Sequence, residues 1–332
     1  MNKGKGEGGM SVAKSNSENK KGVSLFKNGL KTEMLLVGIL VILFIFFSVT
    51  SPVFLKTDTL MKLLKQASIY GIIAIGMVFV ITSSGIDISV GSVVGLSGII
   101  VSMCMLSGMG VMVSILIAIL ASVLVGLFNG VLVFDANVPP FIATMASMTI
   151  VRNIILLITG AKTISGLPKG FTAIAAGSVF GVPNLFLAWF AIILMSFFIS
   201  KKTVFGRNIY SYGSNKEAAR LSGINTRVTV YGVYVFCAVV CGIAGILLTS
   251  RLGNGVPTSG DGYELDAIAA AVVGGASLDG GEGSVIGTVL GAMIMAMLRQ
   301  GGTLLGINSF IMEIIIGSLI ALAVVIDKIR RR

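Results

Sequence analysis

The sequence predicts an all-α, polytopic integral membrane protein of about ten transmembrane helices, some of them broken, with a short helix outside the membrane. Of its 332 residues, 55% are hydrophobic and only 12% are charged, and the mean hydropathy is +0.98. Soluble domains carry about 25% charged residues. Because one crossing needs about 20 mainly apolar residues, the apolar content leaves room for roughly ten.

The positive charge is clustered rather than spread over a surface. The formal net charge is +11, and residues 1–33 hold seven lysines, residues 201–227 six Lys or Arg, and residues 328–332 four. Basic loops next to membrane spans stay in the cytoplasm. We therefore expect both termini and the 201–227 loop on the cytoplasmic face of a bacterial plasma (inner) membrane. The lipid bilayer, and not a nucleic acid, explains the charge.

The apolar runs divide the chain into spans in order. The first five are expected at about residues 34–54, 67–82, 92–106, 111–134 and 141–158, and the next five at 185–199, 228–248, 267–276, 284–298 and 307–326. An even number of crossings places all three basic clusters on one face, as the charge requires. Residues 160–183 are expected to form the longest loop on the opposite face.

Three parts follow from this pattern. Residues 1–32 predict a disordered, basic cytoplasmic tail, because they are rich in Lys, Gly and Ser and lack an apolar run. Residues 33–328 form the transmembrane domain, which includes the 201–227 loop. Residues 329–332 are a basic cytoplasmic end.

Two polar, glycine-rich breaks interrupt the spans. The pattern Asp-x-x-x-Gly-Ser-Val-x-Gly begins at Asp87 and again at Asp279. Paired breaks indicate a transporter site, because unwound backbone is tolerated at membrane depth only where protein or water covers it. The echo fits a true repeat and a chance match equally well, since Gly and Ser are frequent in packed membrane helices, and its orientation stays open. The candidates for a translocation path are Asp87, Ser89, Gly91, Ser92, Asp279, Gly283 and Ser284.

Ionisable residues inside the spans are functional candidates. For Asp87 we weigh contact with the path equally against a cap on the helix that starts near Ser89. For Arg152 and Glu313 we expect structural pairing or a position facing the bundle rather than substrate contact.

Several classes of chemistry are excluded. The chain has no histidine, which rules out Ser-His-Asp catalysis and histidine metal ligands. The three cysteines, Cys104, Cys237 and Cys241, lie in apolar runs and are expected to pack rather than bind metal. No phosphate-binding Gly-x-x-x-x-Gly-Lys-Ser/Thr loop occurs, so we expect no catalytic residue, no metal and no cofactor, and any ATP to be bound by another chain.

The basic loop contains its own helix signal. Glu217 to Leu221 are good helix formers, Asn215 is placed to cap them, and Gly223 is placed to stop them. An ordinary basic loop that only fixes the topology is the alternative.

The order Glu217-Ala218-Ala219-x-x-x-Gly223 resembles the EAA loop of ABC importer permeases. The stretches 85–91 (Gly-Ile-Asp-Ile-Ser-Val-Gly) and 262–276 resemble further signatures of the ribose/simple-sugar branch, and the resemblance covers about residues 34–328. It implies an importer of a ribose-like monosaccharide, with xylose, galactose or a nucleoside left open. The coupling residues would be Arg207, Glu217, Ala218, Ala219, Leu221 and Gly223.

The same resemblance implies partners. They are a cytosolic ABC ATPase that binds ATP, an extracytoplasmic sugar-binding protein, and a second permease subunit, expected as a homodimer with a heterodimer left open. The candidates for contact with the binding protein on the outer face are Arg251, Asp261 and Glu264.

An ion-coupled secondary carrier is the rival class, with Asp87, Asp279 and Glu313 as proton or sodium sites. It explains the breaks but gives the Glu217 loop no purpose. An intramembrane enzyme ranks last, because the sequence shows no paired metal ligands and no convincing nucleophile and base.

Overall fold

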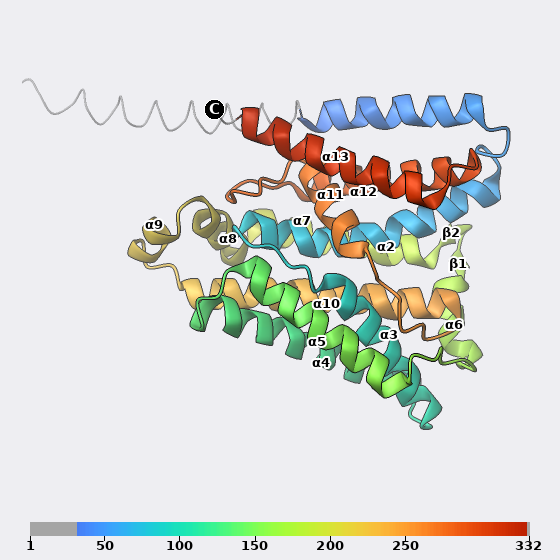
Figure 1. Cartoon of the computed structure of the whole chain (residues 1–332), viewed down its shortest axis with the longest axis horizontal. Coiled ribbons are helices and arrows are strands. Elements are labelled where there is room, and N and C mark those ends of the chain that lie inside the picture. Colours follow the sequence, from blue (N-terminus) through green and yellow to red (C-terminus); the bar gives the residue numbers. More distant parts are fainter. Residues whose placement is uncertain (1–31, 331–332) are drawn as a thin grey trace, which may run out of the picture.

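The computed structural model describes residues 32–330, and its long helices lie side by side along one direction (Figure 1). Seven helices in this range are long and apolar enough to cross a membrane. Further, shorter apolar stretches are α3 (Val90–Leu106) and the part Ser309–Val325 of α13 (Ser309–Arg330). The predicted all-α, polytopic fold is confirmed. The seven are the N-terminal helix (Thr32–Thr50), α2 (Thr57–Thr82), α4 with its π-helical extension η1 (Val111–Asp135), α5 (Pro140–Thr159), α7 (Asn184–Lys202), α10 (Thr226–Leu252) and α12 (Val285–Leu304).

The short elements mark the two ends of the bundle. One end carries α8 (Val204–Ser214) and α9 (Lys216–Leu221), and we call it the α9 end. The other carries α6 (Lys169–Ala176) and a hairpin of β1 (Ser178–Val179) and β2 (Val182–Pro183), and we call it the hairpin end.

The expected long loop at 160–183 is therefore partly structured. Phe171 and Ala175 of α6 are fully buried, and Ser250 fixes this helix to α10 by donating to the carbonyl of Phe171 and accepting from the amide of Ala175. The sequence analysis missed α6 because a helix of eight residues shows too few turns for its periodicity to stand out in a segment with five glycines and two prolines.

Both described ends of the chain reach the α9 end. Glu33 accepts a hydrogen bond from Ser284, and Lys328 forms an ion pair with Asp279, and both of these partners lie just before α12. The even number of crossings inferred from charge agrees with this arrangement. Residues 1–31 and 331–332, which include nearly all of the expected tail, lie outside the described residues.

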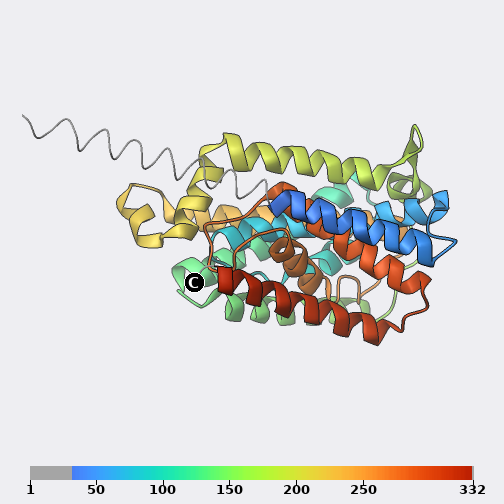
Figure 2. The ribbon, with the colours of Figure 1, turned by 90° about the horizontal axis from the view of Figure 1, so that it is seen from above.

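The core is built around α2 and α10. About four fifths of the apolar window of α2 and most of that of α10 are buried, whereas the N-terminal helix is almost entirely exposed. Figure 2 shows the outer helices, among them α7 and α13, flanking this centre. Peripheral apolar side chains such as Leu157 and Ile314 face outward, as lipid contact requires.

The breaks divide two long helices from two short ones. α2 runs toward the α9 end, the chain turns back through 83–89, and α3 starts near the middle of the bundle (Figure 1). α10 runs the opposite way, the chain turns back through 253–262, and α11 (Tyr263–Val273) also starts inside. The unit of α2 and α3 and the unit of α10 and α11 therefore share the order long helix, break, short helix and run in opposite directions. The sequence pattern shared by Asp87 and Asp279 does not match this arrangement, because Asp279 lies between α11 and α12.

Candidate functional site

Asp87 lies in the first break and is 2% exposed. Its Oδ1 accepts hydrogen bonds from the Ser89 amide at 2.9 Å and from Ser89 Oγ at 2.5 Å, immediately before α3 begins at Val90. The carboxylate thus holds the turn that leads into this helix, whose N-cap residue is Ser89.

A buried polar network extends from Asp87 to the neighbouring helices. Asn129 of α4 donates to Ser89 Oγ at 2.9 Å, and Ser147 of α5 donates to Asn129 Oδ1 at 2.5 Å. Thr144 of α5 accepts from the Ile88 amide at 3.1 Å. All these polar side chains are buried, so the network fixes the unwound segment against two helices.

The two breaks meet at Gly91 and Gly260. A methyl group on Gly91 would overlap the Gly260 carbonyl oxygen, and one on Gly260 would overlap the Gly91 carbonyl. Gly260 has a φ of +83°, which favours glycine. The first turn of α3 and the chain that leads into α11 are therefore in backbone contact inside the bundle.

Arg152 of α5 reaches the second break. Its Nη2 lies 2.6 Å from Asp261 Oδ1, and Nη1 donates to the carbonyls of Pro257 at 2.9 Å and Ser259 at 3.0 Å. The expected structural pairing of Arg152 is thus present, and its partner is one of the residues proposed for the outer face.

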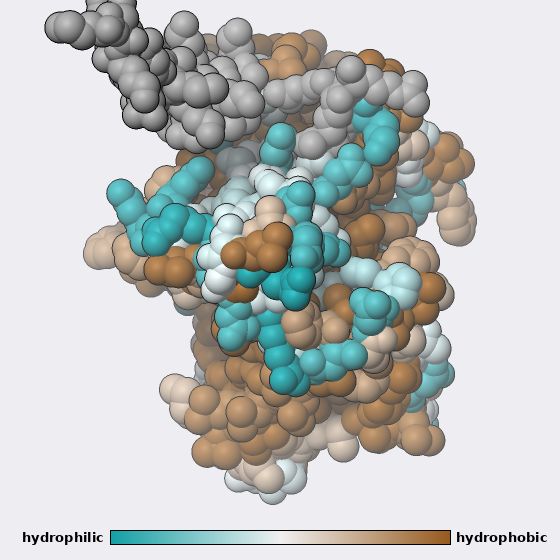
Figure 3. Space-filling view, turned by 90° about the vertical axis from the view of Figure 1, so that its left-hand side faces the viewer, coloured by the Kyte–Doolittle hydropathy of each residue, from teal (hydrophilic) through white to brown (hydrophobic). Residues whose placement is uncertain are grey.

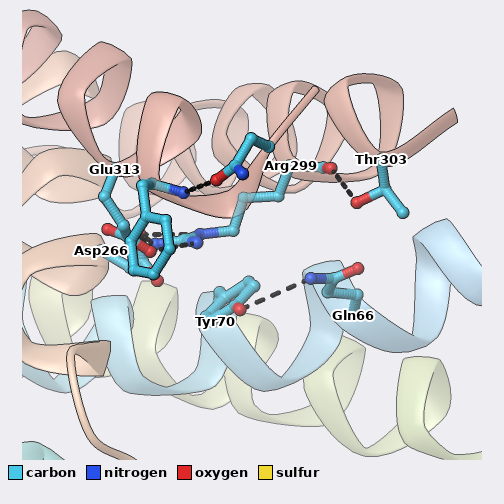
Figure 4. Close-up of polar contacts among 8 residues, drawn as sticks. Gln66, Tyr70, Asp266, Arg299, Thr303 and Glu313 are labelled. Carbon is cyan, nitrogen blue, oxygen red and sulfur yellow. Dashed lines mark hydrogen bonds and ion pairs between the residues drawn. The ribbon is translucent and has the colours of Figure 1, made fainter. Parts of the chain in front are cut away.

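A second ion-pair cluster joins α11, α12 and α13 (Figure 4). Arg299 of α12 donates to Asp266 of α11 at 2.8 Å and to Glu313 of α13 at 2.8 Å. The Arg299 guanidinium also lies 5.9 Å from the ring centroid of Tyr70 on α2. Asp266 is almost fully buried, whereas Glu313 is half-exposed. The expected pairing of Glu313 is present, and four helices converge on one arginine.

At the α9 end, the predicted short helix is confirmed. Asn215 accepts from the Ala218 amide at 2.9 Å as the N-cap of α9, and Gly223 beyond its end has a φ of +80°. Glu217 and Arg220 form an exposed ion pair at 2.7 Å, and the hydrogen bond from Arg220 lowers the pKa of the Glu217 carboxyl.

The exposed face of this end is polar. Figure 3 shows hydrophilic side chains gathered at its centre, with hydrophobic ones around them. Of the expected coupling residues, Ala219 is buried, whereas Arg207, Glu217, Ala218, Leu221 and Gly223 are exposed. These five are accessible to a macromolecule in the cytosol if this end faces it.

The end of α8 is interlocked with both α2 and the loop before α12. Ser84 Oγ lies 2.8 Å from the Gly213 carbonyl and 3.0 Å from the Asp279 carbonyl, and the Gly281 amide donates to Thr82 at 2.8 Å. A methyl group on Gly213 would overlap the Thr82 carbonyl oxygen. We call these five residues the α8 junction.

Tyr210 adds a side-chain link beside the α8 junction. Its hydroxyl donates to the Gly283 carbonyl at 2.8 Å and lies 3.0 Å from Ser200 Oγ of α7. Tyr210, Ser200 and Val285 also line a small pocket there.

The path candidates thus fall into two groups. Asp87, Ser89, Gly91 and Ser92 lie together inside the bundle. The other three lie at the α9 end. Asp279 pairs with Lys328, the Gly283 carbonyl accepts from Tyr210, and Ser284 caps α12.

The residues proposed for the outer face are also divided. Arg251 is exposed in the last turn of α10 at the hairpin end. Asp261 and Glu264 lie deeper, on the segment that returns into the bundle, where Asp261 pairs with Arg152.

The sequence matches, over residues 59–325, the family described as branched-chain amino acid transport system / permease component. The chain belongs to this permease family. Similar proteins include the ribose import permease protein RbsC of Bacillus subtilis (strain 168), 39% identical over 87% of this chain and 90% of that protein. RbsC of Escherichia coli (strain K12) is 38% identical over 88% of this chain and 92% of that protein. The xylose transport system permease protein XylH of the same strain is 34% identical over 91% of this chain and 93% of that protein. The comparison with solved structures gives no significant match.

Sequence reasoning missed several residues that organise this permease. Arg299 could have been noticed as a lone basic residue in an apolar run, by the same rule that selected Arg152. Ser84 and Gly213 carry no such signal, because small residues are common throughout the chain and only the contact between them is informative.

Proposed function

We propose that this chain is the transmembrane permease subunit of an ATP-driven importer that moves a ribose-like monosaccharide across the bacterial plasma membrane. It works with a cytosolic ABC ATPase, an extracytoplasmic sugar-binding protein and a second permease subunit, as a homodimer. The α9 end faces the cytoplasm, so the N- and C-termini are cytoplasmic. Relatives named as ribose and xylose permeases, similar over nearly their whole length, support the substrate class.

The observation that carries the coupling proposal is the α8 junction. A partner that pushes on α9 also moves α8, because only Asn215 separates the two helices. The Ser84 hydroxyl ties the end of α8 to the chain just after α2 and to the loop that leads into α12, and the Gly281 amide ties that loop to the last residue of α2. Three residues after Ser84 the chain reaches Asp87 and the first break. Movement of α9 therefore reaches a buried break through the Ser84 side chain and the backbone that follows it.

The ion-coupled carrier is less well supported. Of its three proposed ion sites, Asp279 and Glu313 are each paired with a basic side chain, and Asp87 accepts hydrogen bonds from Ser89. An ion carrier also needs no exposed, capped helix such as α9.

The test is uptake of labelled ribose by proteoliposomes that contain the permease, its ATPase and its binding protein. We expect uptake to require ATP and to survive a protonophore when ATP is held constant. Uptake that collapses with the protonophore, or that proceeds without the ATPase, would contradict the proposal.

A bulky side chain on the exposed face of α9 should block docking of the ATPase without disturbing the fold of the permease. Ala218→Trp is expected to abolish stimulated ATP hydrolysis and uptake without loss of membrane insertion. Lys162→Trp, also exposed but at the hairpin end, is the matched control and is expected to transport normally. Normal transport by Ala218→Trp would remove α9 as the docking element.

A further inference from the structure

The ion pair of Arg152 and Asp261 lies near the middle of the membrane-spanning length. α5 runs over Pro140–Thr159, and at a rise of about 1.5 Å per residue Arg152 is only about 4 Å from the midpoint of this helix. Asp261 contacts it at 2.6 Å, so both charges share this depth.

Asp261 is nevertheless open to the outside of the subunit. Its side chain is 57% exposed, against 16% for Arg152. Charged groups within a membrane face the bundle interior or a water-filled cavity, because lipid cannot solvate them. An exposed carboxylate at this depth therefore indicates that water or a polar ligand, and not lipid, covers this side of the subunit.

The exposed side of α5 has a polar edge and an apolar edge, as a helix between water and lipid would have. One edge carries Thr149, Arg152 and Asn153 at the spacing of a single helical stripe, which continues to the exposed Met145 one turn earlier. The other edge carries Ile150 and Ile154, both exposed and apolar. The apolar edge suits lipid and the polar edge suits water, so the boundary of the passage runs along α5.

We propose that Arg152, Asp261 and Glu264 line a water-filled passage at mid-depth and bind the hydroxyl groups of the passing sugar. Glu264 follows closely on Asp261 and is partly buried beside Gly91, where a methyl group would overlap its carboxylate. Carboxylates accept hydrogen bonds from sugar hydroxyls and the guanidinium donates to them. Asp87 does not compete for this role, because it is 2% exposed and its Oδ1 is held by Ser89.

Thiol labelling tests whether water reaches this site, independently of the proposed function. The native cysteines, Cys104, Cys237 and Cys241, are replaced by Ala. Asp261→Cys is then compared with Ile150→Cys, which lies at the same depth on the apolar edge of α5 and is 48% exposed. The thiolate attacks the sulfur of a membrane-impermeant methanethiosulfonate reagent, which forms a mixed disulfide and releases methanesulfinate, and lipid disfavours this charged nucleophile. We expect Asp261→Cys in the complete transporter to react at least about tenfold faster. Equal labelling rates for the two cysteine variants would refute the proposed water-filled passage.

Transport measurements test the sugar contact, which rests on the proposed function. Asp261→Asn is the variant of choice, because Arg152 keeps its bonds to Pro257 and Ser259 and the fold should persist. We expect the ratio of ribose to xylose uptake to change, with ATP hydrolysis still stimulated by the binding protein. Fast labelling combined with unchanged uptake and an unchanged ratio would overturn the sugar contact. A wild-type chain without ATP-dependent uptake would instead refute the proposed function, whatever the labelling shows.

Discussion

Ser84 and Gly213 are separated by 129 positions in the sequence, yet Ser84 Oγ lies 2.8 Å from the Gly213 carbonyl oxygen. Ser84 adopts a φ of +58°, an uncommon conformation for a residue other than glycine, which aims its hydroxyl at the end of α8. This contact joins the chain just beyond α2, the most buried of the long helices, to α8, the helix before α9. Several of the expected effects of substitution depend on it.

Gly213→Ala should uncouple ATP hydrolysis from transport. The added methyl group would overlap the Thr82 carbonyl oxygen and push α8 away from α2. Coupling free energies of about 1–3 kcal/mol correspond to about 5- to 150-fold effects, so we expect uptake per ATP hydrolysed to fall at least about fivefold. Gly170→Ala, at a site with open space around it, is the control. Unchanged uptake per ATP in Gly213→Ala would show that the α8 junction does not transmit the motion.

Ser84→Ala should have a milder effect of the same kind. It removes the hydroxyl that donates to the carbonyls of Gly213 and Asp279, a loss of about 0.5–1.5 kcal/mol per hydrogen bond, but leaves the Gly281 amide bonded to Thr82. We expect a small decrease in the melting temperature of the purified permease and partial uncoupling. Full coupling with a reduced melting temperature would assign Ser84 to stability alone.

Asp87→Asn and Asp87→Ala should behave differently. Asn retains an oxygen for the Ser89 amide and caps about as well as Asp, so we expect nearly normal stability and uptake. Ala leaves a buried N–H group without its acceptor, at a cost of about 1–3 kcal/mol. Thermal unfolding in detergent compares the two variants. Uptake lost in Asp87→Asn, at unchanged stability, would show that the charge itself is needed.

Arg299→Met should strongly destabilise the bundle. It leaves Asp266 buried without a partner, and removal of one member of a buried ion pair costs about 3–5 kcal/mol. The double variant Arg299→Met/Asp266→Asn should recover much of this loss. Glu313→Gln should be mild, because Glu313 is half-exposed and Asp266 keeps its bond to Arg299. A melting temperature equally low in the single and double variants would mean that the charge is not the cause.

The elements that the sequence predicted well depend on local signals. Apolar runs predicted the seven long and the two shorter apolar helices of the described range, and most predicted boundaries lie within a few residues of the observed ones. Asn215 and Gly223 bounded α9 correctly, because a cap and a stop act on the backbone within one turn. α2 begins ten residues earlier than predicted, because Lys56, Lys62 and Lys65 make its first turns too polar to be recognised as part of an apolar run.

The echo at Asp87 and Asp279 shows where local similarity misleads. Both are followed by Gly-Ser-Val, yet Asp87 is buried and holds α3, whereas Asp279 is exposed and pairs with Lys328. The two turns also differ, because Gly280 and Gly281 have positive φ whereas no residue of 87–91 does. Depth in the membrane is set by the helices on either side. The inverted relation of α2 and α3 to α10 and α11 left no clear sequence signature.

By itself, the sequence determined that this chain spans a membrane several times, where most of its spans fall, and that a capped helix lies in the basic loop between two of them. These properties follow from composition and from interactions within a few residues. The tertiary structure alone decided that Arg152 meets Asp261, that Arg299 joins Asp266 to Glu313 and that Ser84 meets Gly213. Each of these contacts depends on how separate helices pack, and a linear pattern does not record which charge or glycine faces which.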